Sequence, residues 1–315
     1  MSTSAGSPPP APAPAAAPPP SRLERLQRFD RRWIFLAMGL AIVLPILFPI
    51  GLPIKAGPMT RAAFDTIEAL QPGDVVYLSL DLDPASTPEL EPFYRALMLQ
   101  LKRKGVRIVI GSLWYASPPL VQRWIGESLD RPIAPAGTAG YGGPPDRPYV
   151  KNVDYVNLGF REGKQAVIQN LGADLRKAFD GVAVDGTPLD QIPMLDGRNQ
   201  LKDFDLIILV SAGFPGAKEY VQYVQSTYNL KMVAACTAVS TTDLSPYMQS
   251  GQLLGLVGGL AASAEYELLV GKPGTAVDGA DVLNAGHLMV IVAIIFGNVI
   301  YFVGRRRRRG GGTAS

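Results

Sequence analysis

Apolar and polar positions follow two different periods between residues 74 and 270. Short, nearly continuous apolar runs are typical of strands buried on both faces. Longer segments, in which apolar residues recur every three or four positions, are typical of helices that bury one side. The apolar runs predict strands at 74–82, 106–114, 153–160, 205–213 and 231–239. The periodic segments predict helices at 88–105, 118–129, 161–179, 217–228 and about 245–269.

Strands that alternate with helices predict an α/β fold of the Rossmann-like type, with a mostly parallel sheet flanked by helices. A Pro/Gly-rich loop at 130–148, a polar loop at 180–203 and a linker at 271–284 complete this region. In open parallel sheets, ligands bind beyond the carboxyl ends of the strands. The candidate loops at those ends are 81–87, 114–117, 211–216 and 237–243.

Two further segments, 33–54 and 286–304, are apolar and contain no Lys, Arg, Asp or Glu. About 20 apolar residues in a helix cross a hydrocarbon core of roughly 30 Å, so both segments predict transmembrane helices and not buried core helices. The first contains Pro45, Pro49 and Pro53, which are expected to kink its outer half or to end the helix early. A cleaved signal peptide is the alternative for this segment, but its apolar stretch is long and 32 residues precede it.

Basic residues flank both apolar segments. Residues 22–32 contain five Arg, and residues 305–309 are all Arg. Such flanks stay in the cytoplasm, so the main domain is predicted to lie outside the cytoplasmic (inner) membrane, with both termini cytoplasmic. The formal net charge of +3 belongs to these tails, and the rest of the chain is acidic. We therefore expect the tails to contact membrane lipid, and we expect no nucleic acid partner.

The first 21 residues are rich in Pro and Ala, a composition typical of a disordered, extended spacer. The predicted division is a disordered Pro/Ala-rich cytoplasmic tail with a basic flank (1–32), transmembrane helix 1 (33–54), an extracytoplasmic α/β domain (55–285), transmembrane helix 2 (286–304) and a basic cytoplasmic tail (305–315).

The stretch SAGFPGAKE, residues 211–219, joins the clearest predicted strand to a helix. Small residues there would let backbone N–H groups approach a ligand, and a helix N-terminus favours an anion. The stretch is not a P-loop, because Ala217 follows Gly216, and it is not a dinucleotide-binding G-x-G-x-x-G. A ligand-binding turn and a plain tight turn both remain open. The candidate ligand-binding residues at the strand ends are Ser211, Gly213, Gly216, Lys218, Asp81, Asp83, Thr241 and Asp243.

Asp81 and Asp83 form a D-x-D at the end of the first predicted strand. The pair resembles the D-x-D of the haloacid dehalogenase phosphatases, in which one Asp attacks phosphorus and the other handles protons. The resemblance covers only these few residues, because Pro84 and Ala85 stand where that family has a Gly-Thr pair. The alternative is a helix start that Thr87 caps, with both carboxylates solvated.

The single histidine and the single cysteine restrict the chemistry of the chain. His287 lies at the predicted outer edge of the second span, which excludes a Ser-His-Asp, Cys-His or His-rich zinc site in the domain. Cys236 ends a predicted strand, where burial is expected and reactivity is not. A Ser211–Lys218 pair survives in principle as nucleophile and base. We therefore expect a domain without catalytic residues, metal or cofactor.

Gly251, Gly255, Gly259 and Ser263 recur at every fourth position of the helix predicted at 245–269. On a helix this spacing places small side chains on one face, where another backbone can approach closely. Each glycine costs a helix about 1 kcal/mol relative to alanine, so close packing has to compensate. Two interpretations stay open: tight packing on the sheet, and an interface with a membrane protein partner or a second copy of the chain.

Five segments carry a wider resemblance. They are DYVNLG (154–159), DGTPLDQIPM (185–194), DLIILVSAGFPGAKEYVQ (205–222), TAVS (237–240) and PYMQSGQLLGLVGGLAASAEYE (246–267). Together they resemble an uncharacterised family of prokaryotic two-span membrane proteins with an extracytoplasmic α/β domain. The resemblance implies this architecture over most of residues 35–270 and brings no catalytic residue. The chain departs from the family in its Pro/Ala tail and its loop at 130–148.

Three functions follow as hypotheses. The first is a membrane-anchored, non-catalytic α/β module that binds a ligand or assembles with membrane partners. The second is a metal-dependent phosphoester hydrolase that uses Asp81 and Asp83. The third is an accessory subunit of a larger membrane complex.

Overall fold

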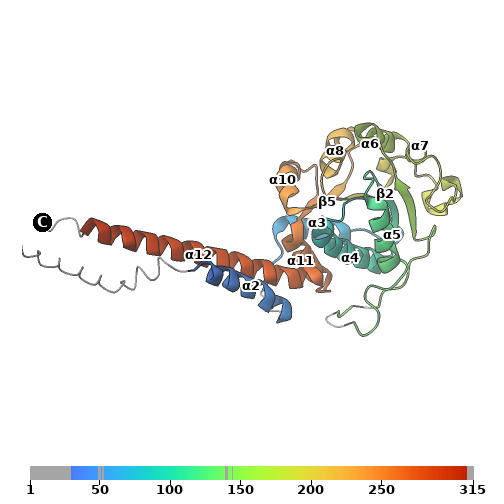
Figure 1. Cartoon of the computed structure of the whole chain (residues 1–315). Coiled ribbons are helices and arrows are strands. Elements are labelled where there is room, and N and C mark those ends of the chain that lie inside the picture. The colour runs from blue at the N-terminus through green and yellow to red at the C-terminus, as the bar shows by residue number, and fades with distance from the viewer. Residues whose placement is uncertain (1–29, 49–50, 52, 139–140, 144, 311–315) are drawn as a thin grey trace, which may run out of the picture. The chain divides into compact units, whose positions relative to one another are not determined.

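The computed structural model describes residues 30–48, 51, 53–138, 141–143 and 145–310, so the predicted disordered tail lies almost wholly outside the described residues. Two compact units divide the chain, one formed by residues 45–283 and the other by the residues before and after them. The larger unit is an α/β domain with helices on both faces of one sheet (Figure 1).

The sheet has six strands, all parallel, in the order β3-β2-β1-β4-β5-β6. The strands are β1 (Val75–Asp81), β2 (Arg107–Ser112), β3 (Tyr155–Phe160), β4 (Leu206–Ser211), β5 (Met232–Cys236) and β6 (Gly255–Gly258). Every residue of β1 and β4 is buried, as their continuous apolar runs predict. The α/β class and the parallel sheet are therefore confirmed, and the first five strands lie where the apolar runs place them.

Helices cover the two faces of the sheet in two sets. Those of the domain are α3 (Pro58–Glu68), α4 (Thr87–Lys104), α5 (Ser117–Ser128), α6 (Lys164–Ala173), α7 (Leu175–Ala178), α8 (Ala217–Tyr220), α9 (Ser226–Tyr228), α10 (Thr241–Gln249) and α11 (Gly259–Val270). One apolar core joins the sheet to α3, α4, α5 and α11, and a second joins it to α6, α7, α8 and α10. The helix after β1 and the helix after β4 therefore lie on opposite faces. This change of face makes the boundary between β1 and β4 the topological switch point of the sheet.

The helix predicted at 245–269 is wrong. This region forms α10, then the short strand β6, then α11. Gly251 and Gly259 have φ values of +76° and +70°, which end one element and start the next. A Cβ on Gly255 would lie 2.2 Å from the Cα of Ala63, so β6 packs directly against α3.

The four small residues therefore do not share a helix face. Gly251 lies in a turn, Gly255 in a strand, and Gly259 and Ser263 in α11, where Ser263 donates to the carbonyl of Glu89 at 2.8 Å. Sheet packing accounts for Gly255. The interface role of these residues stays a prediction, without the helical geometry that motivated it.

Other boundaries also differ from the predictions. The helix predicted at 161–179 is split at Asp174, whose backbone is extended and whose carboxylate accepts from Lys177 N at 2.9 Å. The helix predicted at 217–228 contains a π-helical segment, Val221–Gln225, between α8 and α9. The linker predicted at 271–284 is wrong beyond Gly274, because the helix α12 (Thr275–Gly310) begins there.

Two glutamates of α11 hold the points where the chain enters and leaves the α/β domain. Glu265 accepts a hydrogen bond from Gly57 N at 3.0 Å, just before α3. Glu267 accepts from Gly274 N at 2.9 Å and from Val277 N at 3.0 Å, at the start of α12. Burial raises the pKa of Glu267, although these hydrogen bonds act against the rise. The two ends of the domain are therefore fastened to one helix.

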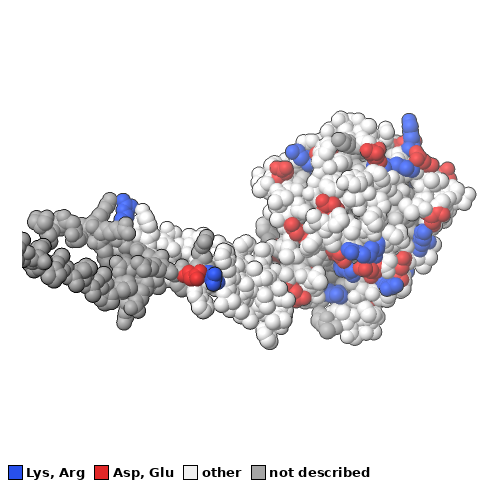
Figure 2. Space-filling model, viewed as in Figure 1, with Lys and Arg blue, Asp and Glu red and all other residues white. Residues whose placement is uncertain are grey.

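The smaller unit contains most of α2 (Arg31–Leu47) and of α12. Within the described residues, Thr275–Val303 is the one helix long and apolar enough to cross a membrane, and none of its most apolar stretch is buried. Figure 2 draws the uncharged side chains of this apolar stretch in white, whereas acidic and basic side chains are spread over the α/β domain. The apolar helix α2 is shorter and ends before Pro49 and Pro53. The transmembrane helix predicted at 33–54 therefore stays a prediction.

Candidate ligand-binding site

Asp81 lies at the switch point, at the carboxyl end of β1, in register with Ser211 of β4. One of its carboxylate oxygens accepts from Leu113 N at 2.6 Å, and the other accepts from Ser79 Oγ at 2.7 Å. Only 1% of Asp81 is exposed. Burial raises the pKa of Asp81 to about 7, against the two hydrogen bonds, which lower it. Asp81 is thus an enclosed carboxylate and not a surface group.

Three buried hydroxyl groups form a hydrogen-bond network next to Asp81. Ser79 Oγ lies 3.1 Å from Tyr220 Oη, which lies 3.5 Å from Tyr77 Oη. Burial also raises the pKa of both tyrosines. The network extends from β1 to α8 and connects the sheet to the helix that follows β4. Such a network is stable because its polar groups are partnered away from water.

Trp114 covers this end of the sheet. It follows β2, and its Nε1 donates to the carbonyl oxygen of Pro215 at 2.6 Å. A Cβ on Gly213 would lie 3.4 Å from the Trp114 ring. The loops after β2 and β4 therefore meet above the strand between them, which is β1 and carries Asp81.

The turn at 211–216 is held by hydrogen bonds of its own. Gly216 N donates to Glu219 Oε2 at 2.8 Å, and Ala217 N donates to Ser211 Oγ at 3.1 Å. A Cβ on Gly216 would lie 2.3 Å from the Gly213 carbonyl oxygen, so only glycine fits there. The first helical amides therefore bind the protein's own side chains. This arrangement is typical of a tight turn. A ligand in this region would therefore be bound by side chains next to the turn and not by its backbone amides.

A cavity of about 230 Å³ opens beside this turn, between the loops after β4 and β5. Its walls are Ser211, Gly213, Phe214, Ala217, Lys218, Glu219, Ser240, Asp243 and Leu244. The structure thus brings together Ser211, Gly213, Lys218 and Asp243 of the predicted ligand-binding residues. We name this space the β4–β5 cavity.

The other four predicted residues do not line the β4–β5 cavity. Asp81 is buried at the end of β1, and Gly216 is packed within the turn. Asp83 closes the turn before α4, where it accepts from Ser86 N at 2.8 Å. Thr241 is turned inward, and its hydroxyl donates to the Thr237 carbonyl at 3.3 Å.

The sequence did not predict the five other cavity residues, which are Phe214, Ala217, Glu219, Ser240 and Leu244. A signal for Glu219 exists, because Glu at the third helical position often accepts from the residue that starts the helix. Glu219 is only 6% exposed although it lines the cavity. Among the residues that the structure describes, neither Glu219 nor Lys218 nor Asp243 forms an ion pair.

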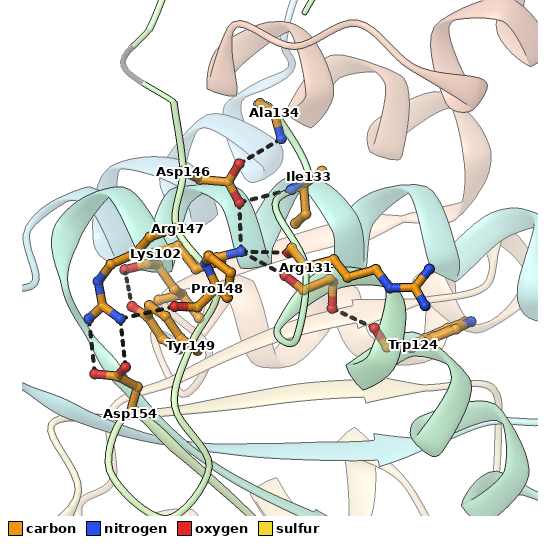
Figure 3. Close-up of polar contacts among 12 residues, drawn as sticks. Lys102, Trp124, Arg131, Ile133, Ala134, Asp146, Arg147, Pro148, Tyr149 and Asp154 are labelled. Atoms are coloured by element: carbon orange, nitrogen blue, oxygen red, sulfur yellow. Dashed lines mark hydrogen bonds and ion pairs between the residues drawn. The ribbon is translucent and has the colours of Figure 1, made fainter. Parts of the chain in front are cut away.

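A second polar cluster fastens the loop at 130–148 and is shown in Figure 3. Lys102 Nζ lies 2.6 Å from Asp146 Oδ2, and the two side chains are 1% and 0% exposed. Lys102 also donates to the carbonyls of Ser128 and Arg131, at 2.8 and 3.0 Å. Ile133 N donates to Asp146 at 2.9 Å. Burial lowers the pKa of Lys102 although Asp146 opposes this effect. Because its partners are all supplied by the protein, we assign this cluster a structural role.

The chain matches no protein-family model, no curated protein and no solved structure. The chemistry of the site therefore rests on its own geometry.

That geometry gives little support to the enzymatic alternatives. Both oxygens of Asp81 and one of Asp83 accept hydrogen bonds from the protein, so three of the four carboxylate oxygens of the pair already have donors. Within the described part of the chain, no three His, Cys, Asp or Glu side chains group as metal ligands. Burial raises the pKa of Cys236 to about 11, which keeps it a thiol at neutral pH.

Proposed function

We propose that the chain is a membrane-anchored, non-catalytic α/β module that binds a ligand outside the cytoplasm. The observation that carries this proposal is α12, whose start is bound to Glu267 in the α/β domain and whose apolar stretch is exposed. An exposed apolar helix of that length is stable in a bilayer and not in water. The β4–β5 cavity supports the binding role, and the enclosed state of Asp81 supports a role without catalysis.

In this proposal α2 forms the first predicted span and α12 the second, and the protein is multi-pass in the cytoplasmic membrane. At 17 residues, α2 is about 25 Å long, slightly less than the hydrocarbon thickness. Local thinning of the bilayer can accommodate this difference. The Arg residues at 22–32 and 305–309 would hold both termini in the cytoplasm and contact anionic lipid. Assembly with a membrane partner, as in an accessory subunit, stays a further hypothesis.

Cysteine labelling tests this topology. In a Cys236→Ala chain, single cysteines would be placed at Thr227, which is exposed on α9, and in the tails at Ser4 and Ala314. In intact spheroplasts, a membrane-impermeant maleimide should label Thr227→Cys at once, and Ser4→Cys and Ala314→Cys only after lysis. Labelling of the tails before lysis, or protection of Thr227→Cys, would refute the proposal. Release of the chain from membranes by alkaline carbonate would refute it as well.

A further inference from the structure

The β4–β5 cavity contains a buried carboxylate without a cation. Glu219 accepts one hydrogen bond from Gly216 N at 2.8 Å, and its side chain is nine-tenths buried. A buried carboxylate is costly unless a positive group is nearby. Asp243, which is exposed on α10, adds a second carboxylate to the walls of the cavity. The interior of the cavity therefore favours a cationic group from a ligand.

The rim of the same cavity offers the opposite charge. Lys218 is exposed, lines the cavity and is without an ion-pair partner among the described residues. Ser211 and Ser240 add hydroxyl groups to the same walls, and hydroxyl groups can donate to a carboxylate. Positive and negative groups thus line one small space without neutralising each other by contact. A ligand with both charges would satisfy them together.

The size and the apolar wall limit what can enter. A volume of about 230 Å³ lies below the roughly 300–1,000 Å³ of sites for drug-sized ligands. Phe214 and Leu244 supply an apolar surface beside the charged groups, and an aromatic ring also favours a nearby ammonium group. A bare metal ion fits the cavity poorly, because no three His, Cys, Asp or Glu side chains lie close enough to ligate one in the part of the chain that the structure describes.

We infer that the β4–β5 cavity binds a small zwitterion of the size of an α-amino acid. Its ammonium group lies between Glu219 and Asp243, and its carboxylate is held by Lys218. The inference rests on the proposed function and names the ligand class of its site.

Isothermal titration of the full chain in detergent tests this inference with defined probes. The panel is glycine, L-alanine, L-serine and L-leucine, together with propionate, which lacks the ammonium group of alanine, and ethylamine, which lacks its carboxylate. At least one amino acid should bind, and the two truncated probes should bind at least tenfold more weakly, because each loses a charge-assisted contact.

Matched variants locate the site. Asp243→Asn and Lys218→Gln should each weaken binding about tenfold or more, since both side chains are exposed and line the cavity. Asp65→Asn on α3 and Lys231→Gln, before the amino end of β5, are exposed controls that should bind as the original chain does. No binding by any amino acid at 10 mM, or equal binding to all four variants, would overturn the inference.

The two proposals fail in different ways. If no probe binds but Thr227→Cys is labelled from outside, the ligand class is wrong and the anchored module stands. If the labelling pattern is reversed, the proposed function is wrong whatever the titration shows.

Discussion

At the scale of single residues, Asp81 makes a prediction about pH. Its pKa of about 7 in the folded chain exceeds the ordinary 3.8 of an unfolded chain. Its contribution to stability is therefore complete below about pH 4 and is lost as the pH rises to about 7. Each unit of pKa difference is about 1.4 kcal/mol, so the buried charge costs up to about 4 kcal/mol above pH 7.

Asp81→Asn should remove this cost, because an amide keeps the acceptor for Leu113 N and carries no charge. The melting temperature of the variant minus that of the original chain should increase between pH 5 and pH 8. Asp83→Asn, two residues away in the turn, serves as the control and should show no such increase. A variant that is less stable than the original chain at pH 8 would contradict the assignment.

Lys102 and Asp146 give a second prediction at this scale. Lys102→Met leaves the Asp146 carboxylate buried without its cation, so unfolding should become easier by about 3–5 kcal/mol. Lys104→Met, on the same helix, removes a partly exposed pair with Glu68 and should cost less than about 1 kcal/mol. Urea unfolding of both variants measures the difference. Equal effects would show that the buried pair does not fasten the loop.

The sequence pattern predicted some of the residues that line the cavity, and it could not predict how side chains from different loops come together. Lys218 and Asp243 could be nominated because both follow strand ends. The burial of Asp81 could not be predicted, since one of its hydrogen-bond donors, Leu113 N, comes from the loop after a different strand. The orientation of such a side chain depends on contacts between distant parts of the chain.

At the scale of elements, β6 was the missed strand. The run from 253 to 264 is apolar and rich in small residues, and periodicity alone does not separate a short strand from a buried helix in such a run. The decisive features are the positive φ angles of Gly251 and Gly259, which sequence spacing does not reveal. The longer and more apolar strands β1 and β4 carried no such ambiguity.

A substitution at Gly255 tests the packing role of this strand. Gly255→Ala should destabilise the chain by about 1–3 kcal/mol or more, because the new Cβ meets the backbone of Ala63. Gly126→Ala in α5 is a matched control with no atom within 4 Å of the added Cβ, and it should stabilise the helix by about 0.5–1 kcal/mol. Thermal unfolding compares the two. A Gly255→Ala chain as stable as the original would contradict the close packing of β6 against α3.

At the scale of the whole molecule, the α/β class was the feature best predicted by the sequence, because it depends on the alternation of apolar runs and periodic helices. The prediction is weaker for the membrane segments. The apolar stretch of α12 is evident from composition and is helical throughout. The first segment is apolar up to Ile54, but its helix ends at Leu47, because prolines remove backbone donors. Composition therefore gives the extent of an apolar segment but not the length of its helix.

The pair of glutamates on α11 has a mechanical consequence. Glu265 holds the chain near Gly57, and Glu267 holds it from Gly274 to Val277. A force applied through the segments on either side of the domain would thus be borne by one helix. The strands of the sheet, which are pulled apart most easily from their ends, would carry little of that load. An excised domain would need to retain residues 57 to 277, because a shorter piece would remove at least one of the backbone donors that bind these carboxylates.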